Sequence, residues 1–117
     1  MTRPIEPLDP QERKFYRYDF VRYLAALGAS VGINPATVQI ELDSASQVLG
    51  VQLGTGSYAP QISGTLIAVA FQVAVPNQSA PEFTGGHRAT VTVRFDTTAP
   101  TPESLVFRFP LLVKRAA

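Results

Sequence analysis

The sequence predicts an all-β protein, an antiparallel sandwich of about seven strands. Runs of β-branched and aromatic residues alternate with polar residues, as in strands that bury one face. Prolines and glycines separate these runs at short intervals, which is typical of sandwiches and barrels. The ten prolines and eight glycines are spread along the 117 residues. This length fits one domain, and 45% hydrophobic residues are enough for one core.

Residues 1–10 are expected to form an extended arm in front of a single domain at residues 11–117. Prolines at positions 4, 7 and 10 remove backbone donors and favour extended neighbours, so the arm should be a poor strand partner. We expect Ile5 and Leu8 to dock on a neighbouring subunit or on the edge of the domain itself. The arm lacks the apolar stretch that a signal peptide or a membrane anchor needs.

An aromatic strand is predicted at residues 15–19, followed by a short helical segment. Residues 20–27 carry apolar side chains at helical spacing, but the segment is too short to be stable alone. We therefore expect one or two helical turns packed over the end of the sheets. Residues 37–43 alternate strictly and predict a half-buried strand. Residues 47–53 predict a weaker strand in which Gly50 marks a bulge or a close backbone approach.

Three longer strands are predicted in the second half of the chain. Residues 65–76 have a bulky face for the core and a face of small residues that could lie under another chain or a covering loop. At about 3.3 Å per residue this run is long for a small sandwich, so part of it should leave the sheet. Residues 87–96 alternate most regularly, and residues 104–113 do the same, with Pro110 suited to an edge strand. The predicted core consists of Val38, Ile40, Leu42, Val69, Phe71, Val73, Val91, Val93, Phe95, Phe107 and Phe109.

We expect no catalytic, cofactor-binding or metal-binding residues. The chain has no cysteine and one histidine, which excludes disulfides, thiolate sites and multi-histidine metal sites. No nucleophile motif accompanies His87, so we interpret it as a partly exposed loop residue. Residues 54–64 are rich in glycine but do not match a phosphate-binding loop, and the acidic residues near the N-terminus do not match a calcium loop.

Basic and aromatic residues interleave in the N-terminal third of the chain. Arginine and aromatic side chains are enriched at protein interfaces, although such mixtures can also bind single-stranded nucleic acid. Nearby acidic residues, a net charge of only +1 and the absence of an RNA-binding motif favour a protein partner. Packing of the first strand is the other interpretation. The candidate interface residues are Ile5, Leu8, Arg13, Tyr16, Tyr18 and Tyr23.

Four segments in order resemble a known family. They are Asp9-Pro10-x-Glu12 before an aromatic run that ends in Asp19-Phe20, the strand at residues 37–43, the pair Gly85-Gly86 before Thr90-Val91-Thr92, and a closing strand with Arg108. Together they resemble the small fiber–tail adaptor proteins of tailed bacteriophages. The resemblance implies an immunoglobulin-like sandwich without catalytic residues. Phe20 stands where the family has a tryptophan.

The resemblance implies a non-enzymatic virion protein, made in the host cytoplasm, that joins the tail to fibers or to neighbouring tail components. Its expected partners are other virion proteins and further copies in a symmetric ring, with no cofactor, nucleic acid or membrane. A capsid decoration or head–tail completion protein is the alternative. A carbohydrate-binding module is a further one, but it needs aromatic platforms, and the chain has no tryptophan and only Tyr58 in a candidate loop.

Overall fold

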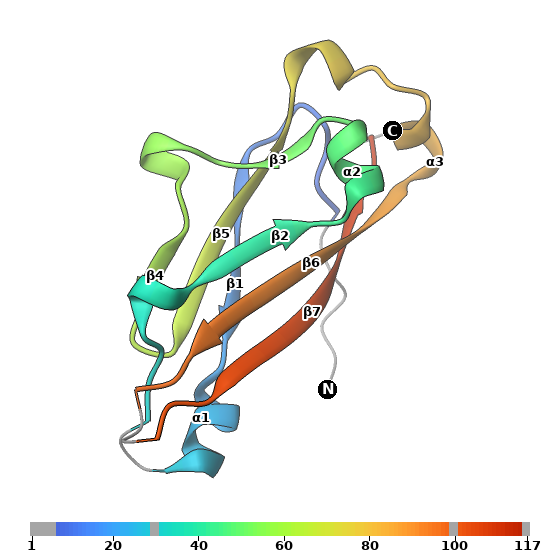
Figure 1. Cartoon of the computed structure of the whole chain (residues 1–117). Helices are drawn as coiled ribbons and strands as arrows, with labels where there is room; N and C mark the ends of the chain where they lie inside the picture. Colours follow the sequence, from blue (N-terminus) through green and yellow to red (C-terminus); the bar gives the residue numbers. More distant parts are fainter. Residues whose placement is uncertain (1–6, 29–30, 99–100, 116–117) are drawn as a thin grey trace.

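Two antiparallel sheets face each other in the computed structural model, which describes residues 7–28, 31–98 and 101–115 (Figure 1). The first sheet has the order β1-β5-β3, and β4 also pairs with β5. The second has the order β2-β6-β7. The strands are β1 (Lys14–Asp19), β2 (Gln39–Leu42), β3 (Val51–Leu53), β4 (Gln61–Ser63), β5 (Leu66–Val73), β6 (His87–Asp96) and β7 (Ser104–Val113). The predicted mainly-β, two-sheet architecture is confirmed.

Short helical segments connect the strands. They are α1 (Val21–Leu27), η1 (Pro35–Thr37), α2 (Ser44–Val48), η2 (Gly56–Tyr58), η3 (Val75–Asn77) and α3 (Glu82–Gly85). The helix expected at residues 20–27 is present and buries Leu24. Phe20, directly before it, is buried, and its ring contacts the rings of Phe95, Phe107 and Phe109. Over the described ranges, no helix is long and apolar enough to cross a membrane.

β5 is the central strand of the first sheet. β1 pairs along one of its edges, while β3 and β4 follow each other along the other. Leu53 at the end of β3 lies opposite Phe71, and Gln61 at the start of β4 lies opposite Ala68. Gly54 still donates its N–H to the Ala70 carbonyl oxygen (2.8 Å), but residues 55–60 have no room in the ladder and must loop out of it.

The looped-out residues fold over the outer face of β5. A Cβ added to Gly54 would lie 2.7 Å from the Cβ of Tyr58 and 3.1 Å from the Cβ of Ala70, so only glycine fits this crossing. Ala70 is fully buried beneath it. The small-residue face predicted for residues 65–76 thus lies, at Ala70, under a loop of the same chain rather than under another chain.

The core fills the space between the two sheets, and the core prediction is confirmed. The buried members of the predicted set are Leu42, Val69, Phe71, Val73, Val91, Val93 and Phe95. The others, Val38, Ile40, Phe107 and Phe109, are partly buried against this cluster. Ile40, Phe107 and Phe109 belong to β2 and β7, the outer strands of the second sheet, where fewer neighbours cover a side chain.

One strand prediction needs correction, and another is confirmed. The strand expected at residues 47–53 begins only at Val51, because Gln47 and Val48 belong to α2. Gly50 has a φ of +83°, and a Cβ there would lie 2.7 Å from the side chain of Asn77, which is the close approach expected of it. The run at residues 65–76 leaves the sheet after Val73 and continues into η3, as its length suggested.

Leu8, within the predicted arm, packs against its own domain. Its side chain is fully buried in the core, and it forms a parallel bridge with Val113. Its N–H donates to the Leu112 carbonyl oxygen (2.8 Å), and its carbonyl accepts from the Lys114 N–H (2.9 Å). Pro7 and Pro10 flank Leu8 but leave its own N–H available, so one rung of pairing forms despite the prolines. Leu8 therefore docks on the edge of its own domain, which is one of the two placements expected for it, and not on a neighbouring subunit.

We expect Leu8→Ala to lower the free energy of unfolding by about 2–5 kcal/mol, because it empties a fully buried site. Urea unfolding followed by circular dichroism measures the loss. Val48→Ala is the control, since Val48 is 80% exposed and its change should stay within about 0.5 kcal/mol. Equal losses in the two variants would contradict the placement of Leu8 in the core.

Candidate protein-interaction surface

Aromatic side chains gather along one side of the sandwich, where β1 and β7 are the outer strands of their sheets. Tyr18 stacks on Phe109, with ring centroids 4.3 Å apart and an interplanar angle of 18°. Tyr23 of α1 contacts Phe107 edge-on at 5.0 Å, and Tyr16 contacts a core ring at 5.7 Å. We call these five residues, Tyr16, Tyr18, Tyr23, Phe107 and Phe109, the aromatic seam.

Strand geometry explains why the seam forms. Side chains two residues apart share a face of a strand, so Tyr16 and Tyr18 both lie on the inner face of β1, and Phe107 and Phe109 on the inner face of β7. Both strands are outer strands, which leaves these rings only partly buried. Partly buried aromatic rings offer a partner a large apolar area, and tyrosine adds a polar tip.

The seam continues onto α1, where apolar side chains are exposed. Tyr23 is 62% exposed, and Val21 and Leu27 are also exposed on this helix. Their exposure follows from the shortness of the helix, which buries only Leu24. The end of the sandwich covered by α1 therefore presents an aromatic and aliphatic surface.

Burial changes the chemistry of one tyrosine in the seam. Desolvation raises the pKa of the Tyr18 hydroxyl to about 12, because the charged phenolate would lose water contacts. The shift therefore shows that the hydroxyl lies in a poorly solvated part of the seam.

The predicted interface residues do not all meet. Tyr16, Tyr18 and Tyr23 lie in the seam, whereas Leu8 is in the core and Ile5 falls outside the described residues. Arg13 lies on the outer side of the first sheet, where its guanidinium carbon is 4.5 Å from the centroid of the Tyr58 ring. The same ring stacks with Phe15 at 6.0 Å.

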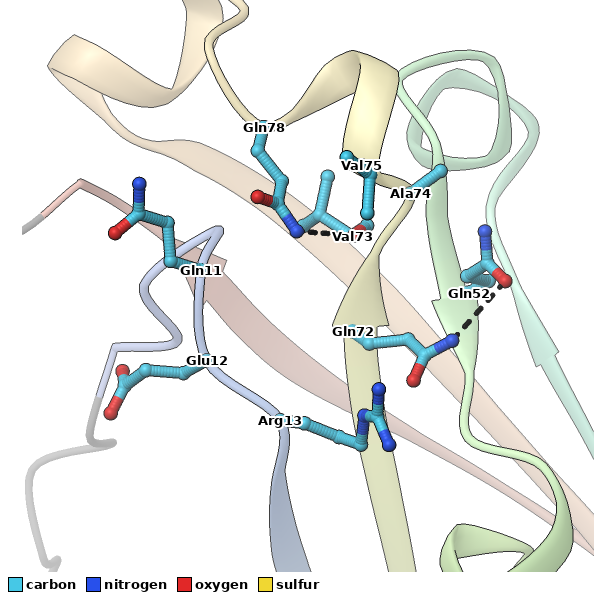
Figure 2. Close-up of a pocket in the computed structure, with 9 residues that line it drawn as sticks. All are labelled: Gln11, Glu12, Arg13, Gln52, Gln72, Val73, Ala74, Val75 and Gln78. Carbon is cyan, nitrogen blue, oxygen red and sulfur yellow. Dashed lines mark hydrogen bonds between the residues drawn. The ribbon is translucent and has the colours of Figure 1, made fainter.

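Arg13 also lines an open groove at the end of the first sheet (Figure 2). The lining residues are Gln11, Glu12, Arg13, Gln52, Gln72, Val73, Ala74, Val75 and Gln78. The Gln72 amide donates to Gln52 Oε1 (3.4 Å), and the Gln78 amide donates to the Val73 carbonyl oxygen (3.2 Å). Its volume is about 150 Å³. Sequence reasoning missed this groove, because its glutamines are far apart in the chain.

His87 is part of a side-chain network, which corrects its interpretation as a loop residue. It opens β6, and its Nε2 lies 2.7 Å from the Ser46 hydroxyl oxygen. That hydroxyl donates to Asp43 Oδ1 at 2.7 Å. We therefore place a proton on Nε2 of His87, so that this N–H donates to the serine oxygen. Asp43 also accepts the backbone N–H groups of Ser46 (3.2 Å) and Thr90 (2.8 Å).

This network does not have the geometry of a catalytic triad. A serine nucleophile passes its proton to histidine and must be open to substrate. Here the serine hydroxyl donates its hydrogen bond to the Asp43 carboxylate rather than to the histidine, and Ser46 is fully buried. The network instead caps α2 and ties it to β6.

Neither metal chemistry nor a known relative identifies the site. No group of three or more His, Asp or Glu side chains is placed to hold a metal ion in residues 7–28, 31–98 and 101–115. No family model matches the chain, and neither does any curated protein or solved structure.

Alkaline conditions should destabilise the protein through Tyr18. Its pKa is raised in the folded state, so its contribution is complete below pH 10 and is lost as the pH rises through about 12. The shift corresponds to about 2–3 kcal/mol. Urea unfolding between pH 9 and pH 12 should show a smaller loss in Tyr18→Phe than in the wild type. Tyr23→Phe is the matched control and should behave like the wild type; if Tyr18→Phe does so too, Tyr18 is not responsible.

Acid should destabilise the protein through Asp43. Burial raises the pKa of this carboxyl, but the hydrogen bonds from Ser46 and Thr90 outweigh it and hold the pKa below the usual value. Its contribution is thus present above pH 4 and lost as the pH falls further. Asp43→Ala should cost about 0.5–2 kcal/mol at pH 7, the usual worth of a helix cap, and less at pH 2–3. A loss in thermal stability that is independent of pH would contradict this.

Proposed function

We propose that this chain is a non-enzymatic structural protein of a tailed bacteriophage particle, an adaptor that joins the tail to fibers or neighbouring tail components. The aromatic seam is the observation that carries the proposal. Its partly buried rings and the exposed Tyr23 are the kind of surface that protein interfaces enrich. The resemblance of four segments to fiber–tail adaptor proteins supports the virion as the place where this surface works.

We assign the fold as immunoglobulin-like, which the strand connectivity supports. In that fold, strands B, E and D lie in one sheet and strands C, F and G in the other. The orders β1-β5-β3 and β2-β6-β7 correspond to these two sets. The Leu8 segment takes the place of the first strand but pairs with β7. Because one fold serves many functions, this assignment supports the adaptor role only together with the seam.

We further propose that several copies form a ring in the particle. A head-to-tail ring needs two different patches on each subunit, because one patch of a copy contacts the other patch of the next. The seam at β1 and β7 is one such patch. Different virion proteins would then contact the faces that the ring leaves open.

The alternatives differ in what supports them. A capsid decoration or head–tail completion protein would use the same surfaces elsewhere in the particle, so only its position separates it from a tail adaptor. A carbohydrate-binding module needs a free aromatic face for stacking. The Tyr58 ring already contacts Phe15 and Arg13, which argues against that role.

The proposal is tested in particles made from the phage genome that encodes this chain. Mass spectrometry of purified particles should detect the chain, and a density map should place it in the tail. Tyr23→Ala should reduce complete particles at least about tenfold, as loss of an interface hot spot worth 2 kcal/mol or more would. Val48→Ala, also exposed, is the matched control and should leave particle yield unchanged.

Absence of the chain from purified particles would overturn the proposal. A density map with the chain on the capsid would replace the tail adaptor with the decoration protein. Thermal melting of purified Tyr23→Ala separates an interface effect from unfolding, because Tyr23 is largely exposed and its loss should leave the melting temperature near that of the wild type.

A further inference from the structure

The groove of Figure 2 is part of a longer feature. A second hollow, lined by Gln11, Val75, Gln78, Ser79 and Arg115, shares Gln11, Val75 and Gln78 with it. The two hollows therefore form one continuous groove from Gln52 on β3 to Arg115 beyond the end of β7. We call it the amide groove, because four of the chain's seven glutamines line it.

Glutamine side chains give the amide groove the hydrogen-bonding character of a peptide backbone. Each carboxamide has donors and an acceptor, as a peptide group has. The bonds from Gln72 to Gln52 and from Gln78 to the Val73 carbonyl use only some of these groups. The Gln72 oxygen and the Gln52 nitrogen are not used in their mutual bond, so both can pair with the backbone of an incoming segment.

The charges of the amide groove favour an acidic partner. Among the lining residues, Glu12 alone carries a carboxylate. This carboxylate accepts the Asp9 N–H at 2.9 Å and lies 3.8 Å from Lys14 Nζ. The two lining arginines meet no carboxylate in the described part of the chain. Arg13 lies over the Tyr58 ring, and Arg115 donates to the Gln78 carbonyl oxygen at 3.3 Å. Both guanidinium groups keep donors for a carboxylate.

We infer that the amide groove binds an extended acidic segment of a partner protein. The backbone of the segment pairs with the glutamine amides, and its carboxylates pair with Arg13 and Arg115. An extended segment fits because its backbone donors and acceptors are free to pair outward. The lining residues include no aromatic side chain, which disfavours sugars and nucleic-acid bases, since both bind by stacking. This inference rests on the proposed function only in taking the partner to be a protein.

Side-chain amide signals in the nuclear magnetic resonance spectrum of the full ¹⁵N-labelled chain test the inference. The probe is a blocked six-residue peptide that alternates Glu and Gly, and the matched peptide alternates Lys and Gly. The acidic peptide should move the Gln11, Gln52, Gln72 and Gln78 signals in a saturable way, and the basic peptide should not. Gln39, Gln47 and Gln61, outside the groove, are internal controls whose signals should stay in place.

Arginine variants test the charge requirement. Arg13→Gln and Arg115→Gln should each weaken binding about two- to fivefold, the range expected for exposed ion pairs. Arg108→Gln removes an exposed arginine from β7 and should leave the affinity unchanged. Added salt should weaken binding of the wild type, because the pairs are exposed.

Three results would overturn the inference: no saturable shift with the acidic peptide, equal shifts with the basic peptide, or equal shifts of the control glutamines. A neutral glucose oligomer that moves the same four signals would assign the groove to sugars instead. Each result is independent of whether purified particles contain the chain. Failure of the groove and failure of the virion proposal are therefore distinguishable.

Discussion

Burial of β5 on both faces is the constraint on which the rest of the structure depends. An antiparallel sheet of a small domain usually leaves one face in water, yet Ile67 to Phe71 are all buried. The bulky residues fill the core, and the outer face must be small enough to be covered by its own chain. Ala68 and Ala70 satisfy this, and Gly54 lets the covering loop approach. The loop splits the outer strand of the sheet into β3 and β4 and brings Tyr58 next to Arg13.

The covering loop lies on a face of the first sheet, whereas β1 forms the edge of that sheet away from β3 and β4. β1 and β7 are both outer strands, and proteins normally protect such edges against unwanted pairing. Here Leu8 pairs at the Val113 end of β7, and Pro110 removes a backbone donor nearby. Toward Ser104, the side chains of Tyr18 and Tyr23 lie against β7 instead. The aromatic seam is thus the part of the edge that the chain protects with side chains rather than backbone.

Alternation predicted the long strands but not the features that depend on single contacts. Residues 87–96 and 104–113 were predicted with the bounds of β6 and β7, because each alternates over ten residues. α2 was missed although Asp43 is a good helix cap, since its five residues are too few for a periodic signal. For Leu8 two placements were expected, and the sequence could not decide between them because a single rung of pairing leaves no pattern. The three tyrosines of the seam were predicted as interface residues. Its two phenylalanines and the amide groove were not, because their positions depend on strand register.

The two surfaces differ in the contacts that they can form, and this bears on how an assembly would hold together. The seam offers apolar area, which is non-directional, whereas the amide groove offers hydrogen bonds and charge, which fix register more than affinity. The ion pairs that Arg13 and Arg115 of the amide groove can form are exposed, so each would contribute about 1 kcal/mol or less. In a closed ring the last contact to form is intramolecular, so it forms at high effective concentration. Weak, chemically distinct surfaces then suffice for a stable and ordered assembly, while the unassembled chain stays free of strong contacts.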